Sequence, residues 1–327
     1  MDNNEIHSKL NVFSAFVQKK LMEKNIISSH EEILLIPHYC MNIYKKQCSH
    51  YIIKCLSSNQ RFFLKILKGN DNAFHCNKYL HKFLSETGEC LYPTILVPEF
   101  EFDGMKYYIT SFIDGVSLDN ITETLTNDEW RIIASKLRSR LNELSTIHSS
   151  LYSEHNDFLT DDCATILKEK FLKRFSHPLF HAYSHKELGE AYERCCKILE
   201  ASRFTKPTLL HMDVKPANII YNSKTGLVTL IDFEFARFGD IDYGWTQVLL
   251  SGINAFRKEY KEQIVPRLTE GYLNLEEALE IPKFQCYIFY QTACNLIYYY
   301  EHNTDYPREI KELFEKLLKK LSKEQRI

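Results

Sequence analysis

The sequence of 327 residues is poor in glycine and has no excess of charge of either sign. Only 10 glycines occur, and the first is Gly69, so no glycine-rich loop precedes that position. The 41 Lys and Arg residues nearly balance the 43 Asp and Glu residues, which leaves a net charge of -2. A nucleic-acid or anionic-membrane partner would favour a basic excess or a basic stripe, so the charge gives no support to either partner.

Signatures of zinc binding, secretion and membrane insertion are also absent. The ten cysteines form no Cys-X-X-Cys pair, so we expect reduced thiols in a cytoplasmic protein. The N-terminus, MDNNEIHSKL, has acid and amide side chains where a secretory signal would be cationic and then apolar. The longest uncharged stretch, 284–300, contains Gln285, Gln291 and Asn295. It is shorter and more polar than a membrane span, so we expect a buried helix there and no membrane partner.

The first third of the chain has mainly strand patterns. Apolar residues recur at helical spacing near the start, from Ile6 to Leu21, and again at 77–84. A turn-like Ser57–Gln60 and an Asp103-Gly104 pair each separate two apolar runs, which predicts two hairpins. The strands expected are 33–36, 51–56, 61–67, 95–100 and 106–112, with one further helix at 77–84.

Helical patterns dominate after Asp114-Gly115. The expected helices are 130–147, 164–175, 187–199, 261–273, 282–300 and 308–321, interrupted by one hairpin, 219–221 with 227–231. A sequence of 44% hydrophobic residues can bury a sizeable core. The change of pattern indicates an α+β fold with two lobes around a cleft, an N-terminal lobe 1–115 and a C-terminal lobe 116–327.

Three oxygen-bearing side chains flank the expected hairpin 219–231, two before it and one after it. Asp213 and Asn218 lie in the stretch HMDVKPAN, and Asp232 lies in the IDFE that follows the hairpin. Phosphoryl transfer needs a carboxylate to orient a hydroxyl and accept its proton, and oxygen ligands for magnesium. This spacing of Asp, Asn and Asp fits both requirements. The structural alternative is an ordinary turn whose Asp caps a loop or helix.

The pattern H-x-D-x-x-x-x-N followed by I-D-F-E resembles aminoglycoside phosphotransferases, choline kinases and their relatives, which share a protein-kinase-like fold. The downstream FGDIDYGW resembles the Gly-Asp segment of the same family. The resemblance implies that Asp213 is the catalytic base and that Asn218 and Asp232 bind Mg²⁺. It also implies that His211 braces the loop. Met212 and Glu234 depart from the Arg and Gly of protein kinases, whereas Lys215-Pro216 is protein-kinase-like.

The resemblance extends to nucleotide binding in the N-terminal lobe. Lys65, in the middle of FFLKIL, matches the strand lysine that holds the α- and β-phosphates. Its alternative role is a lysine on the solvent face of the strand. Ser111 and Ile113 match the hinge whose backbone bonds the base of ATP or GTP, with Thr110 behind them. His148 matches a family histidine that packs or caps rather than reacts.

Two features depart from the family pattern. The loop 40–49, which would cover the phosphates, contains no glycine, so Lys45 or Ser49 would have to contribute. The Glu that pairs with the strand lysine is also missing, because Cys76, Asn77 and Lys78 occupy the expected helical turn. An inactive kinase-fold binding module therefore stays an alternative.

The acceptor is expected to be a small molecule. Acidic residues in the second half suit a cationic acceptor, and aromatic residues there could enclose an amine, although both could be ordinary surface and core. The acids are Glu234, Asp240, Asp242, Glu270, Glu276, Glu277 and Glu301, and the aromatics are Trp245, Tyr287, Tyr290 and Tyr298 to Tyr300. Modification of an aminoglycoside antibiotic is the first hypothesis. A metabolic kinase of choline, a sugar or homoserine is the alternative, and the sequence does not indicate an oligomeric state.

Overall fold

The structure is a computed structural model that describes residues 3–38, 50–67, 92–147, 163–202, 207–254, 260–302 and 308–323. The chain forms two compact units. The first contains residues 1–115 together with 231–235, and the second contains residues 116–230 and 236–327. The segment with Asp232 therefore belongs to the unit that contains Lys65.

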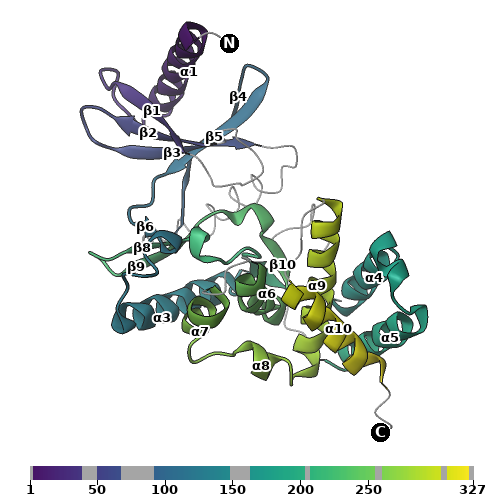
Figure 1. The fold of residues 1–327 in the computed structure, drawn as a ribbon. Coiled ribbons are helices and arrows are strands. Elements are labelled where there is room, and N and C mark those ends of the chain that lie inside the picture. The colour runs from purple at the N-terminus through teal and green to yellow at the C-terminus, as the bar shows by residue number, and fades with distance from the viewer. Residues whose placement is uncertain are drawn as a thin grey trace. The chain divides into compact units, whose positions relative to one another are not determined.

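The first unit contains a five-stranded antiparallel sheet in the order β1-β2-β3-β5-β4 (Figure 1). Its strands are β1 (Ile33–His38), β2 (His50–Cys55), β3 (Arg61–Leu67), β4 (Ile95–Phe102) and β5 (Met105–Ser111). Both expected hairpins are confirmed, β2 with β3 and β4 with β5. At the tip of the second hairpin, Asp103 has φ 50° and Gly104 has φ 70°. A two-residue turn with positive φ at both positions matches the right-handed twist of the strands, and Asp and Gly accept that conformation most readily.

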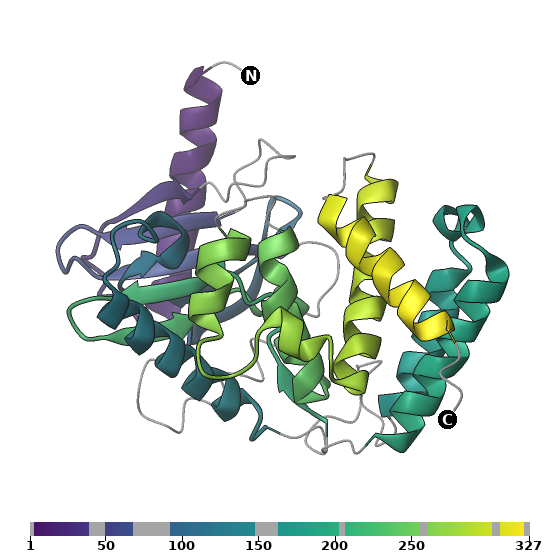
Figure 2. The same ribbon diagram turned by 60° about the horizontal axis from the view of Figure 1, so that its bottom comes forward.

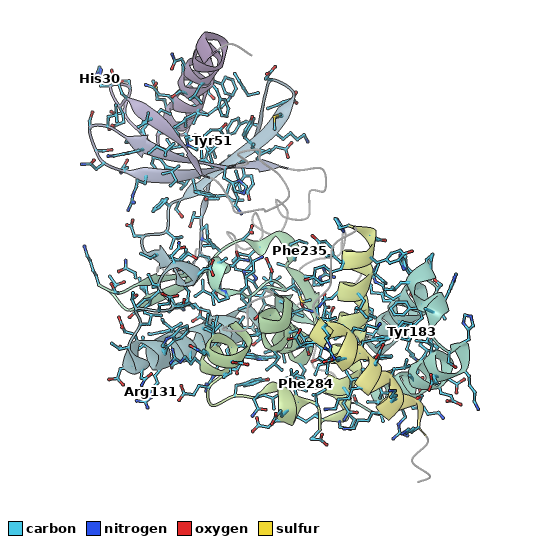
Figure 3. All side chains as sticks on the ribbon, in the orientation of Figure 1. His30, Tyr51, Arg131, Tyr183, Phe235 and Phe284 are labelled. Carbon is cyan, nitrogen blue, oxygen red and sulfur yellow. The ribbon has the colours of Figure 1, made fainter. Side chains whose placement is uncertain are left out.

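Helix α1 (Asn3–Glu23) packs against this sheet (Figure 1). Phe13, Val17 and Leu21 are buried against the sheet as the helical spacing predicted. The Phe13 ring lies 4.8 Å from the Tyr107 ring and 5.9 Å from that of Tyr51, which Figure 3 labels on the sheet. The helix therefore supplies the apolar cover for one face of the sheet.

The second unit is mainly helical (Figures 1 and 2). Its longer helices are α3 (Asn127–Leu144), α4 (Cys163–Phe175), α5 (His185–Ala201), α6 (Ile241–Asn254), α9 (Pro282–Glu301) and α10 (Arg308–Ser322). The short helices α7 (Val265–Leu268) and α8 (Leu275–Ala278) lie between α6 and α9 in the sequence. The expected hairpin is confirmed as β8 (Ile219–Asn222) with β9 (Leu227–Leu230), and β6 (Val116–Ser117) extends it. Strand β7 (Thr208–Leu210) pairs with β10 (Arg237–Gly239).

Several expectations differ from the structure. The expected helix 261–273 is wrong in its second half, because α7 ends at Leu268 and a turn with Gly271 at φ 71° follows. Helix α3 begins three residues earlier than expected, because Thr126 and Glu129 form a capping box at its start. Helix α6 and strands β7 and β10 were not predicted. The expected helix 77–84 and the loop 40–49 lie outside the described residues.

The long uncharged stretch forms helix α9, as expected. Eleven of its residues are buried in the second unit, and the Tyr243 hydroxyl of α6 donates a hydrogen bond to Gln291 of this helix. In the described part of the chain, no helix combines the length and the apolar character that crossing a membrane requires.

We expect Phe13→Ala to lower the stability of the first unit by about 3–5 kcal/mol, because it removes a buried ring from the helix–sheet contact. Urea unfolding followed by circular dichroism measures this loss. The matched control is Val12→Ala, whose side chain is 59% exposed. Trp130 and Trp245, the two tryptophans, both lie in the second unit, so their fluorescence records that unit separately. Equal effects of the two substitutions would contradict the proposed packing.

Candidate active site

The stretch 211–218 forms a loop that is anchored at both ends. All three residues of β7, which precedes it, are buried and pair with β10. The loop closes through a short 3₁₀ turn, Pro216–Asn218, that runs directly into β8. His211 is 1% exposed, and its Nδ1 accepts a hydrogen bond from the Asp213 amide at 3.3 Å. The contact of His211 is thus with the loop backbone, as a bracing residue requires.

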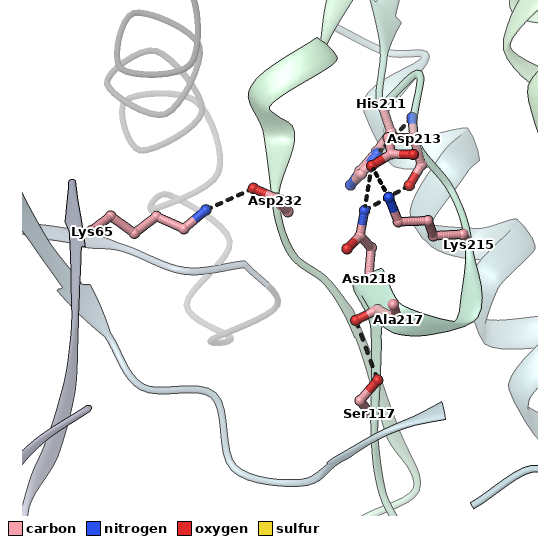
Figure 4. A network of polar contacts seen from close by, with 8 residues as sticks. All are labelled: Lys65, Ser117, His211, Asp213, Lys215, Ala217, Asn218 and Asp232. Atoms are coloured by element: carbon pink, nitrogen blue, oxygen red, sulfur yellow. Dashed lines mark hydrogen bonds and ion pairs between the residues drawn. The ribbon is translucent and has the colours of Figure 1, made fainter. Parts of the chain in front are cut away.

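Asp213 is the centre of a polar network within this loop (Figure 4). The Asn218 amide nitrogen donates to Asp213 Oδ2 at 2.8 Å and to the Asp213 carbonyl at 2.9 Å. The Lys215 Nζ lies 2.7 Å from the same Oδ2. Because the amide nitrogen of Asn218 faces Asp213, its amide oxygen points to the other side. The structure therefore brings Asp213 and Asn218 together, and it adds Lys215, to which the sequence analysis gave no role.

Lys65 and Asp232 form an ion pair within the first unit, with Nζ 2.8 Å from Oδ1 (Figure 4). Lys65 lies in β3 and is paired in register with His50 on one side and Tyr108 on the other, so its backbone is fixed in the middle of the sheet. Both side chains are partly buried, at 17% and 33% exposure. The sequence analysis left open the partner of Lys65, and the structure provides Asp232.

Two residues of these segments have left-handed backbone conformations. Met212 has φ 64° and Asp232 has φ 66°. The other non-glycine residues with positive φ in the described ranges are Asn25, Asn59 and Asp103. Asn and Asp both tolerate the left-handed region. Met212 has no such tolerance. Strain of this kind persists where the surrounding structure imposes it, and it concentrates at functional sites.

The segment after β5 is tied to neighbouring strands of the first unit. The Ser111 amide donates to the Thr94 carbonyl at 2.8 Å, and the Thr94 amide donates to Ser111 Oγ at 2.9 Å. Arg61 forms an ion pair with Asp114, and its guanidinium carbon lies 4.3 Å from the centre of the Phe112 ring. Ile113 lies between these two anchored side chains, so the chain conformation around it is restrained from both sides.

The Gly-Asp segment begins helix α6 and links it to two neighbours. Asp240 is 2% exposed, accepts from the Asp242 amide at 2.9 Å and lies 2.6 Å from Lys283 Nζ at the start of α9. Lys283 also contacts Asp242 at 2.9 Å. Burial opposes the charge of Lys283, but the hydrogen bonds and charges of the two aspartates outweigh it and raise the pKa of Lys283. A Cβ on Gly244 would come within 3.1 Å of the Leu210 side chain, so α6 packs closely on the strand that enters the loop.

The acidic and aromatic residues considered for acceptor binding have other contacts. Asp240 and Asp242 bind Lys283, Glu277 caps α8 through Asn274, and Glu301 lies 3.6 Å from His177. The side chain of Glu234, like all of His148, is outside the described residues. Trp245, Tyr287 and Tyr290 are buried in the core, whereas Tyr298 and Tyr300 are exposed. These contacts do not form a single acidic wall, so the acids alone do not support a cationic acceptor.

No cluster of three or more His, Cys, Asp or Glu side chains that could bind a metal ion occurs among the residues that the structure describes. A magnesium site built from one aspartate, one asparagine oxygen and phosphate oxygens would not require such a cluster.

Comparison with known proteins identifies the family. Residues 58–281, more than half of the chain, match the sequence profile of the phosphotransferase enzyme family. The chain belongs to the phosphotransferase enzyme family. This confirms the resemblance on which the sequence analysis relied, and with it an enzyme that transfers phosphate to an alcohol group. No curated protein matches the sequence significantly.

Solved structures of phosphotransferases have the same fold. The complex of APH(2″)-IIIa with GDP and kanamycin is 18% identical, with a TM-score of 0.55 over 94% of this chain and 97% of that one. The streptomycin–ATP complex of APH(2″)-IIa is 17% identical, with a TM-score of 0.55 over 93% and 96%. A candidate fructosamine-3-kinase from Haemophilus somnus 129PT is 14% identical, with a TM-score of 0.58 over 92% and 96%. These similarities confirm the expected α+β, two-lobed, protein-kinase-like fold.

We expect Lys283→Met to lower the stability of the second unit by about 3–5 kcal/mol, because it leaves the buried Asp240 carboxyl without its cationic partner. Urea unfolding followed by the fluorescence of Trp245, in α6, measures the loss. The control is Lys186→Met, which removes an 84% exposed lysine from a surface pair with Glu190. A loss for Lys283→Met no larger than the control would contradict a buried pair that holds α6 to α9.

Proposed function

We propose that this phosphotransferase transfers the γ-phosphate of ATP or GTP to a hydroxyl of a small molecule, with Asp213 as the catalytic base. The observation that carries the proposal is the set of hydrogen bonds to the Asp213 carboxylate. Asn218 and Lys215 both donate to one of its oxygens, Oδ2. These contacts fix the orientation of the carboxylate. Its other oxygen then takes the acceptor proton as the acceptor oxygen bonds to phosphorus and the bond from phosphorus to the nucleoside diphosphate breaks.

Asn218 and Asp232 are the proposed ligands of Mg²⁺. Both offer hard oxygen atoms, and the amide nitrogen of Asn218 is engaged by Asp213, which leaves its oxygen for a cation. Asn218 directly precedes Ile219 and Asp232 follows Leu230 by two residues, and Ile219 and Leu230 are paired in the hairpin. When bound, the ion would neutralise charge on the phosphate oxygens.

Lys65, Ser111 and Ile113 are the proposed nucleotide-binding residues. The Lys65 ammonium is already held beside a carboxylate, and the phosphates of a nucleotide would offer it stronger acceptors. The Ser111 amide is engaged by Thr94, so the backbone group that Ser111 would offer to the base is its carbonyl. Ile113 would provide the second backbone contact.

Lys215 is proposed as a further contributor to charge balance. Its ammonium lies beside the base and its side chain is 45% exposed, which allows the ammonium to approach negative charge that develops on the transferring phosphoryl group. A resemblance to protein kinases at Lys215-Pro216 was the available signal in the sequence.

The acceptor has two candidate classes, both compatible with the family. An aminoglycoside is supported by the similar structures, which are complexes with kanamycin and streptomycin, and would make the protein an antibiotic-resistance enzyme. A metabolic acceptor such as choline, a sugar or homoserine is supported by the candidate fructosamine-3-kinase. A nucleotide-consumption assay with Mg²⁺ against this panel tests the function. Binding of no nucleotide and turnover of no acceptor would instead indicate an inactive kinase-fold module.

We expect Asp213→Ala to lower kcat by about 10²- to 10⁴-fold, the usual contribution of a general base, while nucleotide still binds. Rates are compared with those of Asp128→Ala, which removes a carboxylate 88% exposed at the start of α3. Full activity of Asp213→Ala would refute the assignment of the base.

We expect Asp232→Ala to abolish the dependence of nucleotide affinity on Mg²⁺, because it removes the carboxylate proposed to bind the ion. Isothermal titration with ATP and with GTP, each at a series of Mg²⁺ concentrations, measures the effect. Asp128→Ala again serves as the control, and an unchanged magnesium dependence in Asp232→Ala contradicts the ligand assignment.

A further inference from the structure

Ser117, in β6, lies beside the turn that carries Asn218 (Figure 4). Its backbone is paired with Ile220 of β8, two residues after Asn218, and both segments belong to the second unit. The Ser117 hydroxyl donates to two backbone carbonyls of this turn, that of Ala217 at 3.2 Å and that of Pro216 at 3.3 Å. These partners are 100 and 99 positions away along the chain, so the contact is made by the tertiary structure.

The Ser117 side chain does not serve the helix that it precedes. Ser117 is at the N-cap position of a short 3₁₀ helix, Leu118–Asn120, where a serine oxygen commonly accepts a hydrogen bond from an amide of the first turn. None of residues 118–120, all of which the structure describes, forms such a bond with it. The hydroxyl is therefore used for the turn Pro216–Asn218 and not for local capping.

The contact with Ala217 completes the hydrogen bonding of the peptide unit that joins Ala217 to Asn218. The N–H of this unit donates to the Lys215 carbonyl at 2.8 Å. The carbonyl of the same unit accepts from Ser117. Because a peptide unit is planar and both of its polar atoms are engaged, the backbone that enters Asn218 has a fixed orientation.

The side chain of Asn218 is held as well. Its Nδ2 donates to Asp213 Oδ2 at 2.8 Å, and the residue is 5% exposed. With the backbone held through Ser117 and the amide nitrogen held by Asp213, the position of the amide oxygen is determined. A ligand of Mg²⁺ needs such a fixed position, because this ion demands a nearly ideal octahedral arrangement of its ligands.

We propose that Ser117 is a positioning residue of the phosphotransfer site, which holds the amide oxygen of Asn218 in place as a ligand for Mg²⁺. The inference rests on the proposed function and adds a residue of β6 to the site. Hydrogen bonds behind the direct ligands orient them and tune the affinity of a metal site. Loss of the Ser117 hydroxyl should therefore weaken metal binding more than it weakens the fold.

Substitutions that differ only in the hydroxyl test the residue. Thr keeps the hydroxyl and Val replaces it with a methyl group, and strands accept both side chains. We expect Ser117→Val to raise the Mg²⁺ concentration required for half-maximal nucleotide affinity by about 2- to 10-fold, the usual effect of one lost hydrogen bond. Ser117→Thr should stay close to the wild type. Isothermal titration with ATP and with GTP at a series of Mg²⁺ concentrations measures the shift.

The control is Ser139→Ala, which removes a hydroxyl that contacts Glu143 on the surface of α3. Nucleotide affinity without Mg²⁺ and the melting temperature should change little in Ser117→Val. Equal magnesium dependence of the Val and Thr variants would overturn the proposal. A loss of metal-free affinity as large as the loss with Mg²⁺ would assign Ser117 a structural role only and would also overturn it.

A double-mutant cycle tests whether the effect passes through Asn218. In the Asn218→Ala background the ligand oxygen is already absent, so Ser117→Val should cause no further change in magnesium dependence. Additive effects of the two substitutions would show that Ser117 acts by another route and would contradict the positioning role.

Hydrogen exchange separates this inference from the proposed function, because it requires no nucleotide, metal or acceptor. In peptides that cover 211–222, amides of the turn should exchange about 2- to 10-fold faster in Ser117→Val than in Ser117→Thr, since one hydrogen bond that opposes local opening is lost. Faster exchange supports the positioning of Asn218 even if no nucleotide binds and the proposed function fails. Unchanged exchange overturns it even if Asp213 and Asp232 prove essential for phosphate transfer.

Discussion

The hydrogen bonds that hold the Asp213 carboxylate are the interaction on which the candidate site depends. Lys215 and Asn218 contact the same oxygen from positions two and five residues further along the chain, and the turn Pro216–Asn218 brings Asn218 back to it. His211 fixes the other end of the loop by accepting from the Asp213 amide. The left-handed conformation of Met212 follows from these bonds, because the backbone must reverse between a buried histidine and a partly exposed aspartate.

Packing beneath the loop explains why this geometry is stable. The loop emerges from β7, whose partner β10 leads into the Gly-Asp segment and α6. Helix α6 approaches β7 closely at Gly244, and Lys283 joins its first turn to α9 through Asp240 and Asp242. The loop, α6 and α9 are consequently linked by the contacts of Lys283 with two aspartates and by one close helix–strand contact.

The sequence was sufficient for those parts in which local pattern and tertiary structure agree. Strand β3 was predicted with its observed bounds, because its short apolar run has the length of a strand and follows the turn-like Ser57–Gln60. Helix α6 was missed because IDYGWTQVLLSGIN contains two glycines, and its helical state depends on close packing at Gly244 and capping by Asp240. Strands β7 and β10 have three residues each and exist only as partners of one another. The pairing of Lys65 with Asp232 joins residues 167 positions apart, a separation that no local pattern encodes.

The same distinction applies to the acceptor. Seven acids in the second half of the sequence suggested an acidic surface for a cationic acceptor. In the structure, however, Lys283 neutralises Asp240 and Asp242, so these two acids are not available to a ligand. The free energy of binding an ion depends on charge that its neighbours leave uncompensated, not on the number of charged residues. The number of acids in the sequence therefore does not decide the charge of the acceptor, because the fold pairs Asp240 and Asp242 with Lys283.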